Sequence, residues 1–305
     1  MSATLAAIFA PGFLGSSQVQ IAATVGAVVA VVAGTVGVFT VIRGQSFAGE
    51  ALGDIGTTGE SGAFLVAVGP LWGLAAAAIA AAAVMEMIGI QRPRGRDVAT
   101  GVVLGAGLGL AALFLYLEAT DHNNSGATFT IVFGSPFAIT SSAIPLVVAF
   151  SVIALGLIGA LFRPLLLCSI SPELAAGHGI AVRLVGAGYL LALATAVALA
   201  AFTIGTILST ALLVGPAATA LRLTRSPGRA IVAAALIGIG STWLGILMSY
   251  DSYDWPPLQH GWPVSFFVVS LILVAYLLAG LRRRRPASPT TRPETAELAA
   301  ASTRG

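Results

Sequence analysis

Long apolar runs alternate with narrow polar bands along most of the chain. Nine of these runs approach the ~20 residues that a helix needs to cross ~30 Å of membrane hydrocarbon. The pattern predicts an all-α, polytopic integral membrane protein with about nine transmembrane helices. We expect the spans near residues 20–42, 47–67, 70–90, 98–118, 140–162, 183–202, 205–222, 229–249 and 263–281.

One boundary between spans allows two interpretations. Spans 183–202 and 205–222 lie so close together that Gly205 could mark either a tight hairpin or a break in one long, tilted helix. Merging them would leave an even number of spans and would place one terminus on the wrong side of the membrane. Two separate spans are therefore predicted.

Positive charge is confined to the bands between the spans. All 15 basic residues are arginines, and an N-terminus outside the cell would place every arginine band on the cytoplasmic side. This distribution agrees with the positive-inside rule. It predicts a multi-pass plasma-membrane protein with its C-terminus in the cytoplasm. Because the arginines follow the membrane edges, the net charge of +3 does not indicate a nucleic-acid partner.

The expected membrane topology divides the chain into three parts. Residues 1–19 form a short extracytoplasmic segment, and residues 20–282 form the transmembrane domain. Residues 283–305 are rich in Pro, Thr, Ala and Glu, a composition typical of a disordered tail, here on the cytoplasmic side.

Composition excludes several functions. With 57% hydrophobic and 9% charged residues, the chain has too few charges to cover the surface of a soluble domain. Cys168 is the only cysteine, so no intrachain disulfide can form. The absence of lysine rules out a GxxxxGK[ST] phosphate loop, so we expect no ATP hydrolysis by the chain itself and no enzyme activity.

The second span carries carboxylates that no ordinary apolar span contains. A charge near the bilayer centre costs about 2.5–3.5 kcal/mol on insertion scales, so it survives where it meets water, a cation or a proton path. Residues at spacings of i, i+4, i+7 and i+11 share one helix face. Four oxygen-bearing side chains follow this spacing and are called the oxygen stripe below: Glu50, Asp54, Thr57 and Ser61.

The oxygen stripe predicts a cation path. Glu50 and Asp54, one turn apart, can jointly ligate a divalent metal, and oxygen donors suit Mn or Mg better than Zn. An alternative is that Glu50 lies near the inner interface and is only solvated or paired with Arg43. Glu60 lies off the stripe, on a face of small residues suited to helix packing, where it could line the path or bond across a helix contact.

The longest cytoplasmic connection contains a helix start. Ser171 is a favourable N-cap, Pro172 suits the first turn, and Glu173 complements the positive end of the helix dipole. Gly177 and Gly179 should end this helix. A short helix at about 171–179 is therefore expected at the cytoplasmic face.

Five stretches, in order along nearly the whole chain, resemble motifs of the ABC-3 family of permeases. These are the membrane subunits of bacterial zinc, manganese and iron importers. The fourth stretch is similar to the family's Asp-x-Glu-x-Ala-x-x-x-Gly loop, and the fifth to its Gly-x-Leu-Leu-x-x-Ala-Leu-Leu-x-x-Pro-Ala-Ala segment. The stretches are 37–43, 46–54 with Gly59, 133–135, 171–179 and 206–219.

The resemblance implies a type II ABC-importer-like permease that works as a homodimer. An ABC ATPase subunit would bind the inner loop helix and hydrolyse ATP, and an extracytoplasmic metal-binding protein would dock outside. The transported divalent metal would be cargo rather than a tightly bound cofactor. The positions implied in coupling to the ATPase are Ser171, Pro172, Glu173, Gly177, His178 and Gly179.

The chain departs from the family at its acidic segment. Zinc and manganese members usually read Gly-Asp-Ala-x-Ser-His-Ala, whereas the aligned positions here are Glu50 and Asp54. Loss of the imidazole removes a nitrogen ligand that favours zinc. An all-oxygen set favours a harder ion or a transient passage.

Two other functions remain open from the sequence. One is a permease of the iron-siderophore and cobalamin importers, which commonly have about ten spans and lack an intramembrane acidic pair. The other is a secondary transporter that uses Glu50 and Asp54 as proton or sodium carriers. A requirement for a separate ATPase distinguishes the importers from the secondary transporter.

Overall fold

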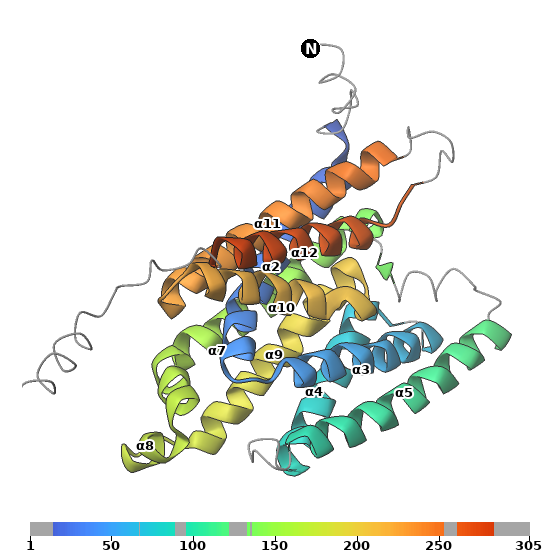
Figure 1. Cartoon of the computed structure of the whole chain (residues 1–305). Coiled ribbons are helices and arrows are strands. Elements are labelled where there is room, and N and C mark those ends of the chain that lie inside the picture. Colours follow the sequence, from blue (N-terminus) through green and yellow to red (C-terminus); the bar gives the residue numbers. More distant parts are fainter. Residues whose placement is uncertain are drawn as a thin grey trace, which may run out of the picture.

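A computed structural model describes residues 15–66, 68–88, 96–121, 133–134, 136–252 and 261–283. All regular structure in these ranges is helical, as expected (Figure 1). Two 3₁₀ turns, η2 (Pro136–Ala138) and η3 (Ser141–Ala143), precede α7. The α-helices are α2 (Ser17–Ile42), α3 (Ser46–Leu65), α4 (Pro70–Ile88), α5 (Arg96–Asp121), α7 (Ile144–Ile170), α8 (Pro172–Gly177), α9 (Val182–Ile204), α10 (Thr206–Leu223), α11 (Pro227–Asp251) and α12 (Val264–Arg283).

Each of the nine expected spans coincides with one long helix. Within the described ranges, seven of these helices are long and apolar enough to cross a membrane, and α3 and α10 are not among the seven. Helix α3 carries three carboxylates in 20 residues, which lowers its apolar character. The count of nine membrane spans therefore stays a prediction, while the multi-span, all-helical architecture is confirmed.

Gly205 separates α9 from α10. Its φ of +90° lies in a region that side-chain-bearing residues rarely adopt, so α9 ends and α10 begins there. Gly134 approaches this break, because a Cβ added to Gly134 would lie 2.4 Å from the Gly205 backbone nitrogen. The prediction of two helices around Gly205 is confirmed, and the glycine of the Phe-Gly-Ser motif packs against the break.

Helices α2 and α9 form the centre of the bundle. Every residue from Val32 to Thr40 is buried, as are most residues from Leu190 to Ala201. Helix α2 packs against α7, α9, α10 and α11, and α9 also packs against α3, α4 and α7. A helix that is apolar on all sides is expected in such a position. Figure 1 shows α3 beside α4 and α5, on the opposite side of the molecule from α11 and α12.

The outer helices expose large apolar side chains. Val152 of α7, Leu236 of α11 and Leu277 of α12 are each more than half exposed. A soluble protein rarely presents so many apolar side chains to water. These surfaces are therefore suited to membrane lipid, which agrees with the predicted multi-span protein.

Helix α3 meets α4 through backbone contact. A Cβ added to Gly59 would lie 2.0 Å from the carbonyl oxygen of Gly73, and a Cβ added to Gly73 would lie 2.1 Å from that of Gly59. Real side-chain carbons never approach a backbone oxygen so closely. Small residues at this crossing are therefore required, as in other close helix pairs in membranes.

This contact predicts different effects for one substitution at two glycines. Gly59→Ala should lower the thermal stability of the purified protein, because the new methyl group forces α3 and α4 apart. The expected cost is about 1–3 kcal/mol. Gly109→Ala in α5 is the matched control, since nothing lies within 4 Å of its added Cβ. It should be neutral or stabilise by up to about 1 kcal/mol through helix propensity. Equal stabilities of the two variants would contradict the assigned contact.

Candidate functional site: an oxygen stripe on α3

The packed faces of α3 are occupied by four neighbouring helices. A Cβ added to Gly53 would lie 2.8 Å from Ser209 Oγ of α10, and Gly59 contacts Gly73 of α4. The Thr58 hydroxyl donates a hydrogen bond of 2.7 Å to the Gly107 carbonyl oxygen of α5. With 100° of rotation per residue, these contacts cover the faces toward α9 and α10, α4 and α5. One arc of α3 is left uncovered by these four helices.

The oxygen stripe begins on that remaining arc. Glu50 is exposed, and Asp54 and Thr57 are partly exposed, whereas Ser61 is fully buried. The sequence prediction that Glu50, Asp54, Thr57 and Ser61 share one helical face agrees with the observed helix Ser46–Leu65. Accessibility thus falls along the stripe from Glu50 to Ser61, as it would along a path that enters the protein.

The hydroxyl groups of the stripe are oriented by the helix backbone. Thr57 Oγ1 donates to the carbonyl oxygen of Asp54. Ser61 Oγ lies 2.5 Å from the carbonyl oxygen of Thr57 and 3.2 Å from that of Thr58. A hydroxyl that donates its proton to the backbone keeps its lone pairs for another partner. The stripe therefore offers carboxylate and hydroxyl oxygens, which are the ligands that hard cations prefer.

A single chain does not complete a metal site with these groups. Among the described residues there is no group of three or more His, Cys, Asp or Glu side chains placed to hold a metal ion. Glu50 forms no ion pair within the described part of the chain, so pairing with Arg43 finds no support. Its side chain is exposed, so the alternative that Glu50 is only solvated stays open. Two carboxylates and two hydroxyls suit an ion that keeps some of its water or receives ligands from elsewhere.

Glu60 lies apart from the stripe. Its side chain is 5% exposed, and its Oε2 atom is buried without a hydrogen-bond partner. On the helix it falls on the same side as Gly49 and Gly53, which approach α9 and α10. The alternative of a bond from Glu60 across a helix contact finds no partner at Oε2. Its place on the translocation path stays a prediction.

Helix α8 has the expected start. Ser171 caps it, since Ser171 Oγ accepts from the Leu174 backbone nitrogen at 3.3 Å and donates to Glu173 Oε2 at 3.0 Å. Pro172 occupies the first turn. The helix ends at Gly177, two residues earlier than the expected limit of 179, and Gly179 follows with a φ of +77°.

Helix α8 presents most of its surface outward. Ala175 is fully buried, whereas the other residues from Pro172 to Gly179 are exposed. His178 directly follows α8, and its Nδ1 lies 2.8 Å from the Leu174 carbonyl oxygen. An exposed helix anchored by one small apolar residue is suited to contact a partner protein. The structure does not bring these residues together with the oxygen stripe.

A largely buried polar cluster joins α2 and α9 at the turn before α3, and sequence patterns did not predict it. The Arg43 guanidinium lies 4.9 Å from the ring centre of Tyr189, and its Nε is 3.4 Å from Gln45 Oε1. The Tyr189 hydroxyl donates to Thr40 Oγ1 at 2.9 Å. These residues lie 149 positions apart in α2 and α9, so only the three-dimensional structure brings them together. A tyrosine near the start of a mostly aliphatic span was the available signal.

An ion pair was also missed. Arg183, in the first turn of α9, lies 3.8 Å from Glu86 near the end of α4. The Glu86 side chain is 14% exposed. This ion pair joins the start of α9, which follows α8, to α4, the helix that packs against α3.

Comparison with known proteins assigns the chain to a family. The model of the ABC 3 transport family matches residues 16–278. The manganese transport system membrane protein MntC of Listeria monocytogenes is 28% identical over 245 residues, covering 80% of this chain and 85% of the relative. The zinc transport system membrane protein TroC of Treponema pallidum is 29% identical over 257 residues, covering 82% and 85%.

The fold agrees with that assignment. The structure of PsaBC from Streptococcus pneumoniae in complex with Fab superposes with a TM-score of 0.76 at 24% identity, covering 92% of this chain and 95% of the other. The sequence match spans nearly all of the described helices, and the structural match includes them in the same arrangement. The chain therefore belongs to the ABC 3 transport family.

Proposed function

We propose that the chain is the membrane-spanning permease of an ATP-driven importer for divalent transition-metal ions, in the group Mn, Zn and Fe. The observation that carries the proposal is the oxygen stripe on the uncovered arc of α3, in a chain of this family. Relatives named for manganese and zinc transport support a metal cargo. The match over residues 16–278 favours this function over a siderophore or cobalamin permease and over a secondary transporter.

The donor set favours a hard ion within that group. Glu50 and Asp54 supply carboxylate oxygens, and Thr57 and Ser61 supply hydroxyl oxygens. Manganese accepts oxygen ligands more readily than zinc, which binds better where imidazole or thiolate is present. The stripe would replace water ligands of the ion a few at a time, and the weak, incomplete site would let the ion leave again.

A second copy of the chain would complete the path. The stripe lies on the arc of α3 that α4, α5, α9 and α10 leave uncovered. A homodimer with a two-fold axis beside this arc would bring two stripes together and enclose Glu50, which is exposed in the single chain. Doubling the ligands would supply the oxygen donors that one stripe lacks.

Energy for transport would come from a separate ATPase. The chain contains no lysine and hence no phosphate-binding loop of the P-loop type. Helix α8 offers an exposed surface with Glu173 in its first turn. An ABC ATPase subunit would bind this surface on the cytoplasmic side, and an extracytoplasmic metal-binding protein would deliver the ion. In this scheme the N-terminus would lie outside the cell and the C-terminus in the cytoplasm.

Movement of α8 would reach the stripe through the Arg43–Tyr189 cluster. Helix α8 packs against α7 and α9, and Tyr189 lies two turns into α9. Arg43 and Gln45 form the turn that precedes α3, only a few residues before Glu50. A shift of α9 would therefore displace the start of α3. Tyr189 is a positioning residue in this scheme, because it does not touch the metal path.

The metal path predicts the effect of neutralising both carboxylates. Glu50→Gln combined with Asp54→Asn should reduce divalent-metal uptake to the background of cells without the transporter, because amide oxygens bind cations far more weakly. Assembly with the ATPase subunit should remain normal. Uptake of radioactive manganese in cells that lack other importers measures the effect.

Asp97→Asn is the matched control for that experiment. Asp97 is an exposed carboxylate in the first turn of α5 and is not part of the stripe, so its loss should leave uptake unchanged. Normal uptake by the double variant would assign Glu50 and Asp54 a structural role. Uptake by reconstituted permease on an ion gradient alone, with no ATPase subunit, would contradict ATP-driven import.

The coupling scheme predicts a graded effect at Tyr189. Tyr189→Phe removes the hydrogen bond to Thr40 but keeps the ring beneath Arg43, so most transport should remain. Tyr189→Leu removes both contacts and should lower uptake several-fold while the partner subunit still hydrolyses ATP. Uptake and ATP hydrolysis are measured in the same proteoliposomes. If both activities fall only in proportion to the amount of assembled complex, Tyr189 has a purely structural role.

A further inference from the structure

Glu60 is a buried carboxyl group that the protein itself leaves without a partner. Among the described residues it is the only Asp, Glu, Arg or His that is buried, at 5% exposure. No hydrogen-bond partner for its Oε2 atom occurs in the described part of the chain. Burial of a bare charge is strongly unfavourable, so a buried carboxylate requires a counter-charge and further polar contacts. The surroundings of Glu60 show which ligand can supply them.

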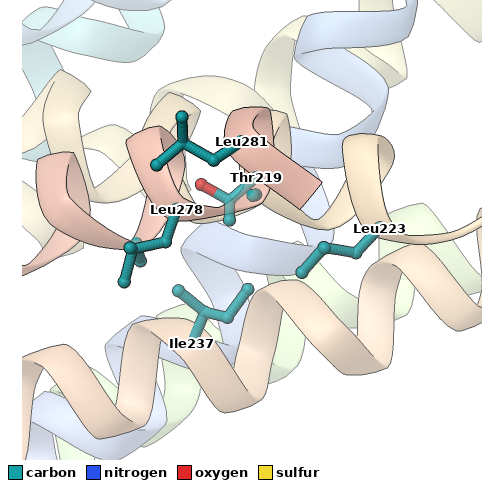
Figure 2. Close-up of a pocket in the computed structure, with 7 residues that line it drawn as sticks. Thr219, Leu223, Ile237, Leu278 and Leu281 are labelled. Atoms are coloured by element: carbon teal, nitrogen blue, oxygen red, sulfur yellow. The ribbon is translucent and has the colours of Figure 1, made fainter. Parts of the chain in front are cut away.

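The groove between α10, α11 and α12 offers no comparable group. Thr219 carries the only polar side chain among its described lining residues, and its hydroxyl donates to the Gly215 carbonyl oxygen at 2.8 Å. Figure 2 shows Thr219 among apolar side chains, which are Leu223, Ile237, Leu278 and Leu281. The unsatisfied charge therefore lies at Glu60, inside the helix bundle, and not in this groove.

Glu60 faces the start of α10. It follows Gly53 by seven residues, which is two helical turns on the same side of α3. A Cβ added to Gly53 would lie 2.8 Å from Ser209 Oγ and 3.5 Å from the Thr206 carbonyl oxygen, both in the first turn of α10. Side chains on a helix lean toward its N-terminus. The Glu60 carboxyl group therefore leans back toward these oxygen atoms.

Glu60 also faces the end of α9. The two helices run in the same direction, because added Cβ atoms on Gly49 and Gly53 would lie 3.8 Å from Leu193 and 3.4 Å from Val197. Seven residues further along, Glu60 of α3 is level with Ile204, the last residue of α9. The carboxyl group thus lies beside the break between α9 and α10.

The helices around Glu60 carry their charges at their far ends. Each of α4, α9 and α10 contains one charged residue, and these are Glu86, Arg183 and Arg222. Arg183 lies in the first turn of α9 and pairs with Glu86, whereas Glu60 faces the last turn. Arg222 lies in the last turn of α10 and donates to the Tyr276 hydroxyl oxygen. None of the three can balance the charge of Glu60.

The break between α9 and α10 supplies oxygen atoms instead. The last four carbonyl groups of a helix have no partner within it. On α9, the Ala201 carbonyl oxygen accepts from the Gly205 N–H at 2.8 Å, and the carbonyl groups up to Ile204 follow. Ser209 Oγ donates its proton to the Thr206 carbonyl oxygen at 2.8 Å, so its lone pairs stay available. Broken membrane helices of this kind can bind cations through their carbonyl ends.

These oxygen atoms suit a cation better than a proton. A protonated carboxyl group must reach an acceptor at about 2.5–3.0 Å, and no described residue lies so close to Oε2. A cation at roughly 2.4 Å from each ligand can bridge oxygen atoms about 5 Å apart. One carboxylate balances one positive charge, so a monovalent ion leaves the buried site neutral.

We propose that Glu60 binds a sodium ion at the junction of α3 with α9 and α10. The ligands would be the Glu60 carboxylate, the Ser209 hydroxyl oxygen and carbonyl oxygens at the end of α9. Close packing of α3 on α10 at Gly53 leaves little room, which favours sodium over the larger potassium ion. The ion would connect the two sides of the break at Gly205. The site is independent of the proposed metal cargo, since Glu60 lies off the oxygen stripe.

Thermal unfolding of the purified, full-length protein tests the proposal. The midpoint is measured in sodium chloride and in choline chloride at equal ionic strength, with a chelator that removes divalent metals. Choline is too large for the site. Sodium should raise the midpoint by about 2–4 °C, as expected for a ligand that binds only the folded protein. Equal midpoints in the two salts would overturn the proposal and would assign Glu60 as a carboxylic acid.

Glu60→Gln keeps the shape of the side chain and removes its charge. The difference between the two salts should therefore disappear in this variant. Asp97→Asn is the matched control, because Asp97 is an exposed carboxylate in the first turn of α5, and it should keep the full difference. A sodium effect that survives in Glu60→Gln, or that is lost equally in Asp97→Asn, would show that sodium does not bind at Glu60.

Ser209→Ala tests the second ligand without changing any charge. It should at least halve the stabilisation by sodium, because one ligand oxygen is lost. Ser151→Ala in α7 is the matched control, since Ser151 is also buried and its hydroxyl also donates to a backbone carbonyl oxygen, at 2.7 Å. An unchanged sodium effect in Ser209→Ala, or equal losses in both variants, would contradict the assigned site.

The double variant Glu50→Gln, Asp54→Asn separates the sodium site from the oxygen stripe. It should keep the stabilisation by sodium, because both residues lie on another arc of α3. Loss of the effect there would place the sodium ion in the stripe and would overturn the proposal. The measurement involves no metal uptake, so failure of the sodium site and failure of the proposed metal path give different results.

Discussion

The contact of α3 with α4 at Gly59 and Gly73 determines how a helix with three carboxylates is held inside an apolar bundle. The two backbones meet there without intervening side chains, so dispersion contacts extend along both helices. Gly53 permits a similar approach to Ser209 of α10. Because these faces are tightly packed, the remaining arc of α3 can carry Glu50 and Asp54 without becoming part of the core.

The same arrangement accounts for the weak cargo site, shared between two chains, that we propose. A complete set of ligands within one chain would hold a divalent ion tightly, and a tightly held ion is released slowly. Helix α3 instead offers carboxylates one turn apart and hydroxyl oxygens farther along, with accessibility that falls from Glu50 to Ser61. Replacement of the family's histidine by Asp54 removes the most zinc-selective ligand. In the proposed path, the chemistry would thus depend on oxygen donors and on the presence of a second stripe.

Much of this architecture could be predicted from the sequence, because it depends on local rules. Apolar runs located the long helices, Gly205 marked the break between α9 and α10, and Ser171 with Pro172 marked the start of α8. Helical spacing assigned Glu50 and Asp54 to one face and Glu60 to another. The resemblance to the ABC-3 family, which rests on five short stretches, is confirmed by the match over residues 16–278.

Other features could not be predicted because they depend on contacts distant in sequence. Tyr189 meets Arg43 and Thr40 across the bundle, and Glu86 meets Arg183 between α4 and α9. Neither pair has a spacing that periodicity could detect. The burial of Glu60 could not be predicted either. Residue spacing assigns a side chain to a helix face, but only the fold shows which neighbouring helix covers that face.

The polarity of α3 has a consequence for the synthesis of the protein. A segment with Glu50, Asp54 and Glu60 is too polar to enter the lipid bilayer efficiently as an isolated helix, because each central carboxylate opposes insertion by about 2.5–3.5 kcal/mol. Only a few residues separate α3 from α4, and α4 is apolar enough to cross a membrane. The two helices would therefore enter the membrane together as a hairpin, joined at Gly59 and Gly73 before the later helices exist. The glycine contact that holds α3 in the finished bundle would thus also bring it into the membrane.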